Sequence, residues 1–269
     1  MGTDNYFIKP SINSDTIGTY DSLNKDVIEE TIKGFDKESQ ILRKQDILVI
    51  FDPDPFALTQ RLARTFIKDT PSYKPFLYEI PILEYEIKDL SDYKFLIYLS
   101  RKVREGNDRI FKVFNIAHEL QHVIQYIYFK ETFLRIGVIQ GYVRTINKYT
   151  NEFYRNIPTE IDAFRKSKKI ASVLFGENEV DEFILKKKSG SKDDIERSYW
   201  ENIEQVDVQV EYDLRNISEK IWNETKTKIE KMIRDLKNTQ ERRDLNTDEK
   251  NFIEAYEFYQ RETEGHSDF

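Results

Sequence analysis

The chain has 269 residues, enough to bury a sizeable core as one large domain or as a main unit with an appended helical part. Its formal net charge is −7 and no basic domain stands out, so nucleic acid is not an expected partner. The absence of cysteine excludes disulfides and cysteine-ligated zinc, and it fits a reducing cytoplasm.

The N-terminal stretch 1–8 does not combine basic residues with a following apolar run, so we expect no secretory signal. No apolar stretch approaches the roughly 20 residues that a membrane-spanning helix needs. From these two features we expect a cytoplasmic protein that does not associate with membranes.

The first elements in chain order predict a helix and then a strand. Weak helical periodicity runs through residues 23–35, and the apolar run 46–51 predicts a buried strand. The segment 52–55, Asp-Pro-Asp-Pro, is typical of a turn, and we expect it to lead into a helix at about 55–69.

Further strands are expected before residue 100. Proline punctuates residues 71–87, which predict one or two short strands. The apolar run 94–99 is rich in β-prone residues and too short for a good helix, so it also predicts a strand. Together with the earlier elements this predicts an α+β fold, in which helices lie beside a small mixed sheet.

The most informative motif is His118-Glu119-Leu120-Gln121-His122, which holds two of the three histidines of the chain. Apolar residues recur at spacings of three and four from 109 to 130, which predicts an amphipathic helix with Asp108 as a candidate cap. Positions i and i+4 share one helical face, so both imidazoles can reach a single Zn²⁺, and Glu119 can act on the attacking water. The alternative is a helix whose histidines bind nothing.

A third protein ligand is needed, because catalytic zinc sites usually have three. His266 lies in a polar C-terminal tail and is a poor candidate, so a carboxylate is expected. Glu160 shares the apolar face of a helix that we expect to start near 158 and to end at Gly176. Glu152 and Glu131 remain as alternatives.

The histidine motif followed by an acidic ligand on a later helix resembles the gluzincins, a group of zincin metallopeptidases; the resemblance covers about residues 94–175. It implies that His118, His122 and Glu160 hold Zn²⁺ and that Glu119 is the general base. In such enzymes the strand before the active-site helix pairs with extended substrate. The strand 94–99 is therefore expected to be either that substrate-binding edge or an ordinary inner strand.

Tyrosines are the candidates for stabilising the oxyanion that such a reaction forms. Gluzincin-like enzymes use a tyrosine or a histidine for this purpose, and the histidines of this chain are already assigned or distant. Tyr142, Tyr149 and Tyr154 follow the motif and are the candidates, although each can equally be structural.

Other polar residues near the motif are expected to face solvent. Asp162 is four residues before Lys166, which favours a solvated ion pair over a role beside the metal. Asn115 and Gln125 lie about one turn before and after the histidines on roughly the same face. They can hydrogen-bond ligands or substrate from there, but we interpret them as solvated helix residues.

The C-terminal third predicts helices. After Gly176 we expect a short helix, then a charged and flexible connection at 186–193. Apolar spacing predicts a long helix from about 203 to 236, although 206–212 also alternates as a strand would. A last helix is expected at about 247–261.

These patterns predict a zincin-like metallopeptidase unit at 1–185 and a helical C-terminal extension at 194–269, which can also pack as one domain with the first. The extension is expected to pack on the catalytic unit, cover its cleft, contact a partner or self-associate. The predicted function is zinc-dependent hydrolysis of peptides or proteins. The alternatives are a non-catalytic zincin-fold binding module and a metal-dependent hydrolase of a non-peptide bond.

Overall fold

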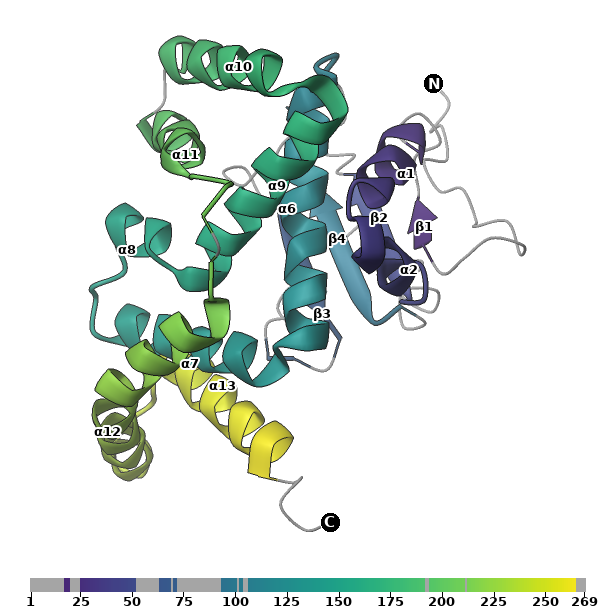
Figure 1. Ribbon diagram of the computed structural model, residues 1–269. Coiled ribbons are helices and arrows are strands. Elements are labelled where there is room, and N and C mark those ends of the chain that lie inside the picture. Colours follow the sequence, from purple (N-terminus) through teal and green to yellow (C-terminus); the bar gives the residue numbers. More distant parts are fainter. Residues whose placement is uncertain are drawn as a thin grey trace, which may run out of the picture. The chain divides into compact units, whose positions relative to one another are not determined.

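The computed structural model describes the chain over residues 17–19, 25–51, 63–68, 70–71, 93–100, 102–103, 106–191, 194–210 and 212–264 (Figure 1). Contacts group the chain into two compact units, the first with residues 1–124 and 163–208 and the second with residues 125–162 and 209–269. Each unit takes two stretches of chain, so this grouping does not coincide with the sequential division expected between 185 and 194.

The first unit contains a mixed sheet with strand order β1-β2-β4-β3. Strands β1 (Ile17–Thr19), β2 (Ile47–Phe51) and β4 (Phe95–Leu99) run parallel, and β3 (Ala63–Ile67) pairs antiparallel with β4. The strands predicted at 46–51 and 94–99 are confirmed. Because β4 lies between β2 and β3 and is fully buried, 94–99 is the ordinary inner strand of the two alternatives, and the alternative of a substrate-binding edge is wrong.

Strand β3 replaces the last part of a helix that the sequence predicted at 55–69. Within the described residues, positions 63–67 pair with β4, with Thr65 opposite Ile97 and Phe66 opposite Leu96. The pairing partner is about thirty positions away in sequence, so local propensity did not reveal it. Residues 52–62 lie outside the part of the chain that the structure describes. So does the segment 71–87, where one or two short strands were expected, apart from its first residue.

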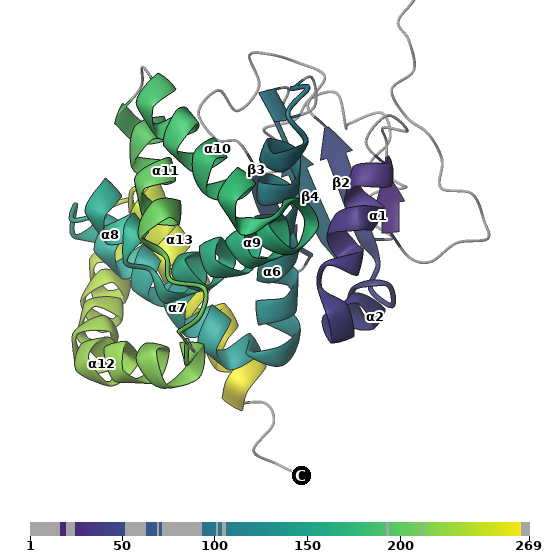
Figure 2. The same ribbon diagram turned by 45° about the horizontal axis from the view of Figure 1, so that its top comes forward.

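In the first unit helices lie on both sides of this sheet (Figures 1 and 2). The described ones are α1 (Lys25–Lys33), η2 (Asp36–Glu38), α2 (Ser39–Leu42), α6 (Arg109–Tyr128), α9 (Pro158–Phe175), α10 (Glu177–Gly190) and α11 (Asp194–Gln205). Helix α6 belongs to this unit as far as residue 124, and α9 belongs to it from residue 163. Aromatic rings join three of them: Trp200 of α11 lies 5.9 Å from Phe114 of α6 and 5.4 Å from Phe183 of α10, between ring centroids. The helices predicted at 23–35, 109–130 and 158–175 are confirmed.

Helix α9 ends where the sequence predicted, and α10 is longer than expected. Gly176 has φ of +92°, a left-handed conformation that favours glycine, and it separates α9 from α10. Helix α10 continues through the lysine run to Gly190, so the flexible connection expected at 186–193 is helical over most of its length. Lys188 of this run bonds to Glu204 of α11 at 2.7 Å.

The long helix expected at 203–236 is two helices. Helix α11 ends at Gln205, residues 206–210 have no regular structure, and α12 runs over Leu214–Gln240. The Asp213 carboxylate accepts a hydrogen bond from the backbone N–H of Asn216 at 3.0 Å, which caps the start of α12. Continuous helix through 206–212 was therefore the wrong interpretation, and so was a strand.

The second unit is helical and has its own apolar core. It contains the last turn of α6, the first turn of α9, α7 (Lys130–Thr145), α8 (Asn151–Arg155), α12 and α13 (Thr247–Glu264), which confirms the helix predicted at 247–261. A Cβ added to Gly141 of α7 would lie 3.1 Å from the Phe252 ring of α13, so a side chain at this position would crowd the contact. The rings of Trp222 and Tyr259 lie 5.0 Å apart between centroids, which joins α12 to α13.

Helix α13 starts with a reciprocal capping box. The Asn246 side chain accepts from the Glu249 N–H at 2.9 Å, and the Glu249 carboxylate accepts from the Asn246 N–H at 2.8 Å. Arg243 also donates to that carboxylate. The hydrogen bond from Arg243, and next the one from Asn246, hold the pKa of Glu249 below its ordinary value.

The described part of the chain is mostly helical with a small mixed sheet, which confirms the α+β class. Among the described helices, none combines the length and the apolar character that crossing a bilayer requires.

Candidate metal centre

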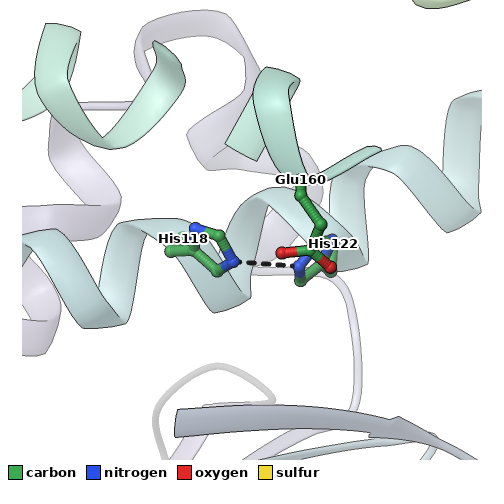
Figure 3. A group of neighbouring side chains, drawn as sticks. All are labelled: His118, His122 and Glu160. Atoms are coloured by element: carbon green, nitrogen blue, oxygen red, sulfur yellow. Dashed lines mark hydrogen bonds between the residues drawn. The ribbon is translucent and has the colours of Figure 1, made fainter. Parts of the chain in front are cut away.

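Helix α6 presents both imidazoles of the motif toward one point. Its start is fixed by Asp108, whose carboxylate accepts a hydrogen bond from the Phe111 N–H at 3.1 Å, as the sequence predicted. One turn apart, His118 and His122 bring their Nε2 atoms to 3.2 Å, with the rings nearly perpendicular at 87°. Figure 3 shows the two nitrogens facing each other.

Glu160 joins the two histidines from the first turn of α9. Its carboxylate points toward the imidazoles in Figure 3, and one ligand atom from each residue lies within 4.8 Å of the others. Glu160 is 9% exposed and His118 is 5% exposed, so two of the three ligand candidates are buried. The residue selected from sequence as third ligand is thus the one that the structure brings to the histidines.

The other ligand candidates are not part of this group. The carboxylate of Glu131 bonds to Arg135 on the same helix, and both Glu131 and Glu152 are exposed. His266 lies outside the described residues.

The donor set and its spacing fit a divalent metal ion. Ligand atoms at about 2.1 Å from a tetrahedral zinc ion are about 3.4 Å apart, close to the observed separation of the two imidazole nitrogens. The carboxylate is farther away, but the glutamate side chain has rotatable bonds that can bring it nearer. Two imidazoles and one carboxylate are a common ligand set for Zn²⁺ and other first-row metals.

Glu119, between the histidines, is held by the sheet. It is 4% exposed, and one of its carboxylate oxygens accepts a hydrogen bond from the Thr65 hydroxyl of β3 at 2.7 Å. The same hydroxyl lies 3.0 Å from the backbone oxygen of Glu119. Thr65 was missed from sequence because its segment was interpreted as helix.

Gln125 and Asp162 also differ from their predicted roles. Gln125 is fully buried, and its amide donates to the Thr159 backbone oxygen and to the Asp162 carboxylate, both at 2.8 Å. Asp162 is half-buried rather than solvated, and the ammonium of Lys166 bonds to Glu38. The expectation of solvated residues at 125 and 162 is therefore wrong.

Asn115 is buried as well, but its bond is local. It is 2% exposed, and its side-chain amide donates to the Phe111 backbone oxygen of the same helix at 2.8 Å. The polarity of these side chains suggested solvent exposure, whereas hydrogen bonds to neighbouring groups allow their burial.

Tyr154 is the tyrosine candidate that reaches the group. Its hydroxyl donates to the Glu160 carboxylate at 2.7 Å. All three tyrosines pack against the apolar core of the second unit. Tyr142 lies 6.1 Å from the Phe252 ring, between centroids, and the Arg144 guanidinium lies 3.8 Å from the centre of the Tyr149 ring.

Comparisons with known proteins give no relative. No protein-family model, curated protein or solved structure matches this chain. The functional argument therefore depends on the geometry of the group itself.

Proposed function

We propose that this chain is a zinc-dependent peptidase with a zincin-like, gluzincin-type site that acts on peptides or proteins. The observation that carries the proposal is the convergence of His118, His122 and Glu160 around one point, with Glu119 between the two histidines on the same helix. This motif and ligand set are those of metal-assisted hydrolysis.

The protein's own residues have distinct roles in this proposal. His118, His122 and Glu160 would hold the ion; when bound, zinc supplies Lewis acidity toward a carbonyl and makes water a stronger acid. Glu119 takes the proton from the attacking water and passes it to the leaving amine. The hydrogen bond from Thr65 fixes the orientation of the Glu119 carboxylate for this proton transfer.

The sheet edge supports a peptide as substrate. Strand β3 is the last strand of the described sheet order, and it carries the Thr65 that contacts Glu119. An extended chain that pairs with the outer side of β3 would add to the sheet through main-chain hydrogen bonds. We therefore assign to β3 the substrate-pairing role that the resemblance had suggested for 94–99.

Tyr154 is the tyrosine that we assign to the catalytic group. Its hydroxyl contacts the carboxylate of a proposed ligand. A donor at this place can stabilise negative charge on the ligand or on a developing oxyanion.

The decisive experiment compares two substitutions in the motif. We expect the purified protein to bind one equivalent of zinc and to cleave unfolded casein. Glu119→Gln should keep the zinc and lose the cleavage, because an amide cannot accept the proton. His118→Ala should lose both, because it removes a ligand. Zinc content is measured by elemental analysis and cleavage by release of fluorescent peptides.

Two outcomes would contradict the proposal. Retained cleavage by Glu119→Gln would refute the assigned base. If the wild-type protein binds zinc but does not cleave peptides in a manner that depends on Glu119, the peptidase assignment is refuted. That result would favour the non-catalytic binding module or the hydrolase of a non-peptide bond.

A further inference from the structure

Gln125 is a fully buried amide with both N–H groups engaged. It lies on α6, three positions after His122. Its Nε2 donates to the backbone oxygen of Thr159 and to the carboxylate of Asp162, each at 2.8 Å. A carboxamide nitrogen has two hydrogens, so these two bonds use its full donor capacity.

The two acceptors flank Glu160 in the sequence. Thr159 precedes it and Asp162 follows it by two positions, all within the first turns of α9. The N–H groups of Glu160 and Ile161 bond to the Ile157 backbone oxygen just before the helix, each at 3.0 Å. A first helical turn has few other bonds to its own helix, and Pro158 has no N–H at all, so bonds from other elements help to fix its position. Tyr154 adds a third bond, directly to the Glu160 carboxylate at 2.7 Å.

We infer that Gln125 is a positioning residue for the metal centre: it fixes the first turn of α9 so that Glu160 faces the imidazoles. The inference rests on the proposed metal site and goes beyond it, because it assigns a share of the metal affinity to a residue outside the proposed ligand set. The helix that supplies the two histidines thereby also orients the segment that supplies the carboxylate.

The chemistry of glutamine suits this role better than the nearest substitutes. A glutamate at position 125 would present acceptors to the Asp162 carboxylate and to the Thr159 carbonyl, and like groups would repel. A methionine of similar length would fill the space and donate to neither acceptor.

Asn115 offers a matched control on the same helix. It is three positions before His118, as Gln125 is three positions after His122, and it is equally buried. Its amide donates to the Phe111 oxygen of its own helix and thus orients nothing on α9. Replacing it tests what the loss of a buried amide near the motif does by itself.

The experiment measures zinc affinity by competition with a chromophoric chelator, and unfolding in urea in the absence of metal. We expect Gln125→Met to weaken zinc binding by about 10- to 100-fold, the usual effect of losing a residue that orients a ligand. Asn115→Leu should lower stability and change zinc affinity less than about threefold. The absorption spectrum of the Co²⁺-substituted protein should change in Gln125→Met and stay the same in Asn115→Leu.

Asp162 provides a second route should Gln125→Met fail to fold. Asp162→Asn keeps an acceptor for Gln125 and should retain the wild-type affinity within about threefold. Asp162→Ala removes one of the two bonds at a half-buried site and should weaken zinc binding about 10-fold.

Equal zinc affinity in Gln125→Met and wild type would overturn the inference, as would an equal loss in Asn115→Leu. If Gln125→Met does not fold, equal zinc affinities of Asp162→Ala and Asp162→Asn would overturn the inference. Absence of zinc binding in the wild type would instead refute the proposed function, so the two failures are distinguishable.

Discussion

The buried face of α6 and the core around α13 are built from different kinds of side chain. Around α13 most buried residues are aliphatic and aromatic, such as Trp222, Ile229 and Phe252, and the buried Glu249 serves the helix cap. Helix α6 also buries apolar residues, but it includes a series of polar side chains that are less than a tenth exposed: Asn115, His118, Glu119, Gln121 and Gln125.

The difference shows where stability and chemistry are located in this chain. Burial of apolar surface stabilises a fold, while each buried polar group costs free energy unless it is hydrogen-bonded. The core around α13 therefore stabilises its unit, and the polar residues of α6 are the kind that folds retain for a site. Substitutions in the two regions should accordingly affect different properties.

The largest effect on stability is expected in the core around α13. Phe252 is fully buried against Gly141, so Phe252→Ala would leave a cavity and lower the free energy of unfolding by about 3–5 kcal/mol. Zinc affinity of the folded fraction should remain as in the wild type. Urea unfolding and zinc competition at low temperature measure the two quantities. A matching loss of zinc affinity would show that the regions are energetically coupled.

A smaller effect, on catalysis alone, is expected on the polar side. Thr65→Val keeps the shape of the side chain but removes the hydroxyl that donates to Glu119. We expect kcat to fall about tenfold at unchanged KM, because the base is less well oriented. Thr65→Ser retains the donor and should restore most of the rate, at unchanged zinc content. Equal rates for the two variants would contradict the positioning role of the hydroxyl.

The smallest effect is expected at the cap of α13. Glu249→Gln should lower the free energy of unfolding by about 1 kcal/mol at pH 7, since it weakens the capping box. Because the pKa of Glu249 is lowered on folding, its contribution is full above the ordinary glutamate pKa and is lost as the pH falls through the folded value. Urea midpoints of the variant and wild type should thus converge at acidic pH. A constant difference would contradict the assigned ionic contribution.

The sequence predicted α6, α9 and the group of His118, His122 and Glu160, because these features follow from local periodicity. Apolar residues at spacings of three and four define a helical face whatever the helix packs against. The cap at Asp108 and the stop at Gly176 are equally local, and both are present in the structure.

The features that the sequence did not reveal depend on distant partners. Thr65 reaches Glu119 because β3 pairs with β4, and the buried amide of Gln125 donates to Thr159 and Asp162, more than thirty positions away. The break before α12 did have a local signal: Asp213, three positions before Asn216, is a helix cap, but the surrounding apolar spacing outweighed it in the interpretation.

The bond between Thr65 and Glu119 joins the strand β3 directly to the proposed base. A peptide that paired with β3, as proposed, would bind the same strand whose Thr65 donates to that carboxylate. Docking and reactivity would then be linked through a single hydroxyl. A substrate backbone that pairs well with β3 would keep the Glu119 carboxylate in place, and one that pairs poorly would leave it misaligned. Discrimination between substrates would then affect the turnover rate as well as the affinity.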